Sequence, residues 1–74
     1  MTVREPDRLP RGCENWQEWR EKYSEYRAEF VTEKMDRLRY RALLAVLGFT
    51  PVDIEKEISE AFLERRKFRL HNAE

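Results

Sequence analysis

The chain has 74 residues and carries 15 Lys and Arg against 15 Asp and Glu, so its formal net charge is zero. Charged residues make up 41% of it and hydrophobic residues another 41%, with only 2 Gly and 3 Pro. This composition favours one small helical domain over a sheet protein or a disordered tail. A neutral total gives no bulk attraction to nucleic acid or anionic membrane, so such binding would need a local concentration of bases.

The small size limits what the chain can do alone. A single core in so short a chain rarely supplies more than about 3–5 kcal/mol without a metal, disulfides or a partner subunit. Cys13 is the one cysteine and cannot form an internal disulfide. His71 is the only histidine, and no ligand cluster surrounds it in the sequence. We therefore expect no cofactor, no metal site and no small-molecule substrate, and a partner subunit remains as the source of extra stability.

We expect neither a secretion signal at the N-terminus nor a membrane-spanning segment. Residues 1–11 hold several charges and two prolines and lack the apolar run of a secretion signal. The longest apolar stretch, 42–49, is under half of the roughly 20 residues that span a bilayer. We expect a cytoplasmic protein without a membrane segment, and a free Cys13 agrees with a reducing compartment.

In chain order, the first predicted elements are an irregular arm over residues 1–14 and a long helix over 15–47. Asn15, with Glu18 three residues later, fits a capping box at the start of this helix. No Gly or Pro interrupts the pattern before Gly48. At about 1.5 Å per residue the helix would be on the order of 48 Å long.

The segment 47–51 predicts a helix end followed at once by a helix start. Gly48 suits the left-handed residue after a helix, Thr50 the N-cap of the next helix, and Pro51 its first turn. Asp53 takes the acidic position of a capping box. A second helix over 51–70 follows, so residues 15–74 are predicted to form an all-α antiparallel helical hairpin.

The long helix carries two apolar seams. The aromatic seam, with three- and four-residue spacing, consists of Trp16, Trp19, Tyr23, Tyr26 and Phe30. The apolar seam consists of Val31, Met35, Leu38, Ala42 and Ala45, with Val46 beside it. The second is offset by one residue, which turns it by about 100° around the helix axis, so one straight partner cannot cover both.

The simplest assignment gives the apolar seam to the second helix and the aromatic seam to another molecule. The matching face of the second helix is formed by Ile54, Ile58, Ala61, Phe62 and Phe68. Opposite charges would meet in the closed hairpin at Arg41–Glu57, Lys34–Glu64, Glu33–Arg65 and Glu29–Arg69. The aromatic seam, with Arg20 and Arg27 at its side, then predicts an oligomeric helix bundle, a homodimer first, or a docked protein partner.

Basic residues support an alternative, a nucleic-acid-binding regulator. Arg20, Arg27, Lys34 and Arg41 are seven residues apart beside the aromatics, a pattern that can hold a single strand by phosphate contact and stacking. The competing interpretation pairs these bases with glutamates of a neighbouring helix. Six acids within 14–33 would repel phosphate.

A second basic concentration lies at the C-terminal end, where it complements the helix dipole. As a functional patch it would contact phosphate or an acidic surface, with Arg39 and Arg66 as the best candidates for unpaired bases. The residues predicted for nucleic-acid contacts are Lys34, Arg39, Arg41, Arg65, Arg66 and Arg69.

No residue pattern indicates catalysis. Cys13 has no neighbouring base, His71 has no acid–base partner nearby, and the glutamates have the spacing of a solvated helix face. The sequence therefore predicts a small non-enzymatic protein–protein interaction or adaptor module, with the nucleic-acid-binding regulator as the alternative. A third arrangement stays open, in which the helix breaks near Thr32 and a three-helix bundle buries the aromatics within one chain.

Overall fold

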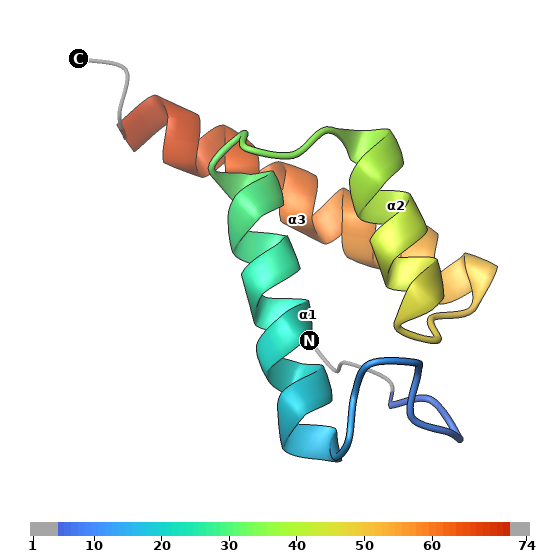
Figure 1. Cartoon of the computed structure of the whole chain (residues 1–74). Helices are drawn as coiled ribbons and strands as arrows, with labels where there is room; N and C mark the ends of the chain where they lie inside the picture. Colours follow the sequence, from blue (N-terminus) through green and yellow to red (C-terminus); the bar gives the residue numbers. More distant parts are fainter. Residues whose placement is uncertain (1–4, 72–74) are drawn as a thin grey trace.

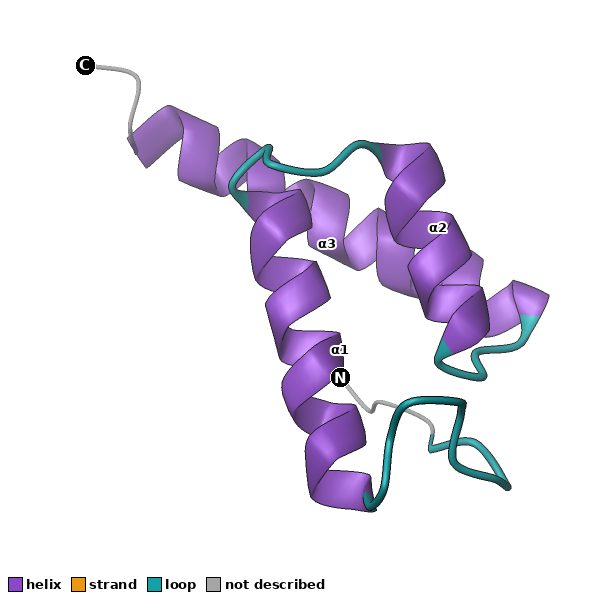
Figure 2. Cartoon of the chain, viewed as in Figure 1, coloured by secondary structure: helices purple, strands orange, loops and turns teal. Residues whose placement is uncertain are grey.

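A computed structural model describes residues 5–71 and shows that this part of the chain is all-helical, with no strand (Figure 2). The helices are α1 (Trp16–Val31), α2 (Arg37–Val46) and α3 (Pro51–His71). The all-α class is confirmed. Residues 1–4 of the predicted arm and residues 72–74 of the predicted helical region lie outside the described residues. No helix in 5–71 has the length and apolar character needed to cross a membrane.

The predicted single helix over 15–47 is wrong, because the chain leaves the helical path after Val31. Glu33 adopts a left-handed φ of 64°. The backbone N–H of Glu33 then donates to the Phe30 carbonyl at 3.1 Å and that of Lys34 to the Glu29 carbonyl at 2.8 Å. These two bonds form the Schellman ending of a helix, with a glutamate at the position where glycine is usual.

Helix α2 begins at Arg37, four residues after Glu33. The carboxylate of Asp36 accepts a hydrogen bond from the backbone N–H of Arg39 at 2.7 Å, as an N-cap does. At the end of α1, the Thr32 hydroxyl donates a hydrogen bond to the Ala28 carbonyl at 2.7 Å, which stabilises this helix end. The break near Thr32, the third arrangement considered from the sequence, is therefore the one that the structure shows.

The other predicted helix ends are confirmed. The Asn15 side chain accepts from the Glu18 N–H at 2.7 Å at the start of α1. Gly48 has a φ of 97°, and its N–H donates to the Ala45 carbonyl at 3.0 Å. The hydroxyl of Thr50 accepts from the Asp53 N–H at 3.2 Å, so α3 begins at Pro51.

All three helices contact one another around one core. In Figure 1, α3 runs behind α1 and α2, and its C-terminal part extends beyond both. The described part of the arm returns from the start of α1 towards the turn between α2 and α3. There a side chain added at Gly48 would place its Cβ 2.5 Å from the Cβ of Pro6.

The aromatic seam supplies much of the core. Trp19 is 0% exposed and stacks on Tyr23 and Phe49, with ring centroids 6.0 and 5.8 Å away. Its indole N–H donates to the Leu47 carbonyl at 2.7 Å. Phe30 stacks on Tyr40 at 4.6 Å. The buried apolar residues are Trp19, Tyr23, Phe30, Met35, Tyr40, Leu44, Leu47, Phe49, Ile54, Ile58 and Ala61.

The apolar seam does not face α3 as predicted. Met35 is buried and Val31 is half-buried, but the α2 members Leu38, Ala42, Ala45 and Val46 are all exposed. Helix α2 instead buries Tyr40 and Leu44. Because the break frees α2 from the path of α1, it can turn its larger side chains inward, which removes more apolar surface from water.

Candidate functional site

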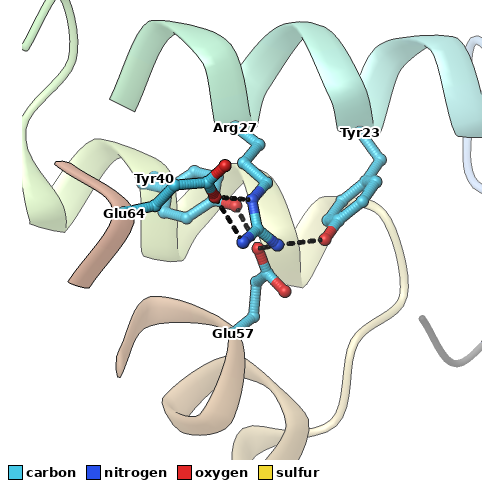
Figure 3. A network of polar contacts seen from close by, with 5 residues as sticks. All are labelled: Tyr23, Arg27, Tyr40, Glu57 and Glu64. Atoms are coloured by element: carbon cyan, nitrogen blue, oxygen red, sulfur yellow. Dashed lines mark hydrogen bonds and ion pairs between the residues drawn. The ribbon is translucent and has the colours of Figure 1, made fainter. Parts of the chain in front are cut away.

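A polar network at the centre of the helices links α1, α2 and α3 (Figure 3). Arg27 on α1 is its hub. Its Nη1 donates to the Glu57 carboxylate at 2.7 Å and to the Tyr23 hydroxyl at 3.0 Å. Its Nε and Nη2 donate to one oxygen of Glu64 at 3.0 and 2.6 Å. The Tyr40 hydroxyl from α2 donates to Glu57 at 2.8 Å.

The network is largely shielded from water. Glu57 is 4% exposed and is the one buried charged residue among those described. Burial raises the pKa of the Tyr23 phenol to about 12, and it raises the pKa of Tyr40 well above its ordinary value with help from the Glu57 carboxylate. Burial alone would lower the pKa of Arg27, but hydrogen bonds to Glu64 and Tyr23 raise it. The two phenols thus stay protonated and Arg27 stays charged at neutral pH, which suits a structural link between helices.

The structure places most of the predicted aromatic interface inside the molecule. Trp19, Tyr23 and Phe30 are buried, while Trp16 and Tyr26 are half-buried against the same core. The expectation that another molecule must cover this seam is wrong. The reason is the break after α1, which lets α2 and α3 reach the aromatic side chains.

The predicted basic stripe is not continuous. Arg20 is exposed on α1 and pairs with Glu5 of the arm at 2.5 Å. Arg27 belongs to the central network, Lys34 lies in the loop before α2, and Arg41 pairs with Glu55. Four bases spaced by seven residues align only on an unbroken helix, and this helix ends at Val31.

Of the four predicted charge pairs, Glu33–Arg65 is confirmed at 3.3 Å. The partners of the other three pairs differ from prediction. Arg41 meets Glu55 instead of Glu57, and Glu33 takes Arg69 as well as Arg65. Glu57 and Glu64 both bind Arg27 instead. The reason is again the break in the helix, which changes the residues of α1 and α2 that lie opposite α3.

The other arginines predicted to contact nucleic acid fall into two groups, those that form an ion pair with a glutamate and those that do not. Arg65 and Arg69 are held by Glu33, whose pKa these two guanidinium groups lower. Arg65 also lies over the Phe30 ring, 5.1 Å from its centroid. Arg39 and Arg66 are exposed, and the structure shows no ion pair for either within residues 5–71.

The outer face of α2 is the surface that the sequence analysis missed. It consists of Leu38, Ala42, Ala45 and Val46. At about 100° per residue, these side chains lie opposite Tyr40, which faces the core. Leu38 is 77% exposed and Val46 58%. This face is therefore an apolar strip in contact with solvent.

The sequence of α2 does indicate that one of its apolar sides must stay uncovered by the core. The ten residues of α2 contain three arginines and no acid, and all the others are apolar apart from the hydroxyl of Tyr40. Such a helix has apolar residues on two opposite sides, so only one can face the chain's own core.

Comparisons with known proteins find no match: no family model fits the chain, and no curated protein or solved structure is significantly similar to it.

Proposed function

We propose that the protein is a small, non-enzymatic protein-interaction module that docks another protein on the outer face of α2. The observation that carries this proposal is that α2 is apolar on both sides. One side, with Tyr40 and Leu44, is buried in the core, and the other is open. A helix with apolar residues on two opposite sides has one apolar face more than the core of its own chain can cover.

The shape of the outer face suits a second helix. Ala42 and Ala45 lie between the larger Leu38 and Val46 along the strip. Small side chains at the centre let another backbone approach closely, and the larger ones at the ends add apolar area. The half-buried ring of Phe62 and the guanidinium of Arg37, 5.2 Å apart, border the inner side of the helix and leave this strip clear.

The proposed partner is a different protein. The predicted homodimer depended on an uncovered aromatic seam, and that seam is buried within the chain. A symmetric pair through α2 would bring the arginines of two copies to one seam, where α2 supplies no acid. A bundle of several copies is thus less well supported than a complex with another chain. The free thiol of Cys13 supports a cytoplasmic location.

Site-directed photocrosslinking in an extract of the source organism tests this proposal. A photoreactive amino acid replaces Leu38 in one variant and Leu70 in the control, because both leucines are 77% exposed. We expect one discrete product of reproducible mass from position 38, and its loss when Ala42→Glu is added. Equal products from both positions, a product that survives Ala42→Glu, or none from position 38 would contradict the proposal.

Nucleic-acid binding is the second candidate, favoured by the exposed guanidinium groups of Arg39 and Arg66. It has less support, because Arg41, Arg65 and Arg69 are paired with glutamates. Binding of a mixed-sequence oligonucleotide that tightens as salt falls, and that weakens in Arg39→Ala, would favour this candidate. Absence of binding at about 50 mM salt would exclude it.

A further inference from the structure

From the charges that border the outer face of α2, we infer that the docked element is an acidic amphipathic helix of another protein. This inference rests on the proposed function and names the chemistry of its partner. It follows from three properties of the strip: the charge at its edges, the size of the side chains along it, and its length.

Only bases stand on α2 at the edges of the strip. Arg39 borders one edge and Arg41 the other: at 100° per residue, Arg39 is about 20° from Val46 and Arg41 about 40° from Ala45. Arg41 forms an ion pair with Glu55. Arg39 is exposed and has no ion pair within the described residues. A partner that carries acids beside its apolar side chains would pair with Arg39, and a basic partner would be repelled.

The side chains along the strip define the partner's shape. Leu38 lies near the start of α2 and Val46 at its end, with Ala42 and Ala45 between them. A large apolar side chain of the partner would fit over the alanines, and smaller ones over Leu38 and Val46. This alternation is how two helices interlock side chains.

The length of α2 sets the size of the contact. Ten residues correspond to about 15 Å, so a partner helix of roughly three turns would cover the strip. An interface of this size falls in the small class, below about 1,200 Å² in total, that is typical of transient complexes. We therefore expect a dissociation constant in the micromolar range, on the order of 1–100 μM.

The strip suits nucleic acid less well. A single strand would need aromatic rings for base stacking beside the bases. Here the aromatic side chains are on the inner side, and the outer face offers only aliphatic groups. An acidic peptide uses both the aliphatic centre and the basic edge.

Binding of designed peptides to the isotope-labelled full chain, followed by nuclear magnetic resonance, tests the inference. One peptide is an 18-residue helix with an apolar strip bordered by glutamates, and the matched peptide has lysine in place of every glutamate. We expect the acidic peptide to shift the backbone amides of residues 38–46 and to bind about tenfold more tightly than the basic one. Equal binding, or shifts confined to another helix, would overturn the inference.

Two charge variants sharpen this test. Arg39→Glu should remove or reverse the preference for the acidic peptide, and Arg66→Glu, an exposed arginine on α3, should leave it unchanged. The same titration with a 20-nucleotide single strand covers the other class of partner. An oligonucleotide that shifts residues 38–46 and is released by Arg39→Glu would overturn the inference.

The outcomes separate this inference from the proposed function. If position 38 gives its specific crosslink but the acidic peptide shows no advantage, the docking face stands and the acidic partner is wrong. If position 38 gives no specific crosslink and neither peptide shifts α2, both are wrong. Circular dichroism of each variant checks that the fold is intact, as expected for changes at exposed positions.

Discussion

The carboxylate of Glu57 on α3 lies 2.7 Å from the guanidinium of Arg27 on α1, and Glu57 is 4% exposed. The same carboxylate oxygen also accepts the hydroxyl of Tyr40 from α2. One buried acid thus holds a group from each of the other two helices. A buried charge is tolerated only when it is paired and hydrogen-bonded. Burial of Glu57 on α3 therefore depends on Arg27 of α1 and Tyr40 of α2.

Glu57→Ala should therefore be strongly destabilising. It leaves the Tyr40 hydroxyl without its acceptor and removes one of the two carboxylates that bind Arg27. We expect a loss of about 2–4 kcal/mol in the free energy of unfolding, measured with urea. The matched control is Glu64→Ala, because Glu64 binds the same arginine from a half-exposed position and should cost less than about 1 kcal/mol. Similar losses in the two variants would contradict a special role for the buried acid.

Alkaline pH should destabilise the fold through the two buried tyrosines. The pKa of Tyr23 is raised to about 12 and that of Tyr40 is raised further, while unfolded tyrosine titrates near 10. The unfolded chain loses these protons first, so stability is full below about pH 10 and falls as pH rises from 10 towards 12. We expect a loss of about 2 kcal/mol for each tyrosine over this range.

Urea unfolding at pH 9 and pH 11 measures this effect, and Tyr40→Phe provides the comparison. Phenylalanine keeps the ring stacked on Phe30 and removes the titrating hydroxyl. The free energy of unfolding should fall less between pH 9 and pH 11 in this variant than in the unchanged protein. An equal decline would assign the alkaline effect to other groups.

Gly48 should tolerate alanine less well than Gly12 does. Both have a left-handed φ, 97° and 89°, so alanine is strained at either position. Only at Gly48 would the added Cβ meet a neighbour, Pro6, whereas Gly12 has open space. We expect Gly12→Ala to cost about 1 kcal/mol and Gly48→Ala about 2 kcal/mol or more.

The double variant Pro6→Gly with Gly48→Ala tests the cause. Removal of the whole proline side chain should return part of the extra loss of stability, because the Cβ and Cγ of Pro6 are the atoms that the added Cβ would meet. If the two losses simply add, the arm does not pack on the turn as described.

The break between α1 and α2 explains why the sequence predicted the helix ends well and the packing poorly. Asn15, Gly48 and Thr50 are standard capping residues, so their roles follow from local chemistry. The break uses Glu33 at a left-handed φ, which residue type alone does not indicate. Two signals were present: Asp36, a good N-cap, and the one-residue offset between the two seams, which was interpreted as a turn around one helix axis.

The candidate site was missed for a related reason. On one unbroken helix over 15–47, Leu38, Ala42 and Ala45 fall in the seam predicted to face α3. The direction in which α2 faces depends on tertiary contacts such as Tyr40 with Phe30 and Glu57. Burial and polar pairing of that kind are set by the whole chain, and no local pattern in 37–46 distinguishes the two apolar sides of α2.

The strain at Glu33 gives a further prediction. Glu33→Gly and Glu33→Ala both remove the ion pairs with Arg65 and Arg69, so they differ only in the backbone. Glycine adopts the left-handed φ of 64° without strain and alanine does not. Glu33→Gly should melt about 4–8 °C above Glu33→Ala, as followed by circular dichroism. An equal or lower melting temperature would mean that the loop adopts another conformation in solution.

The outer face of α2 should contribute little to stability. Leu38 is 77% exposed, so Leu38→Gln should change the free energy of unfolding by less than about 0.5 kcal/mol. Leu44→Ala on the inner side of the same helix, at 0% exposure, should cost about 2–5 kcal/mol. A large loss in Leu38→Gln would assign the strip to the chain's own core. A neutral result, together with loss of the crosslink or of peptide binding, would show that these apolar residues are kept on the surface for a partner, because the fold does not need them there.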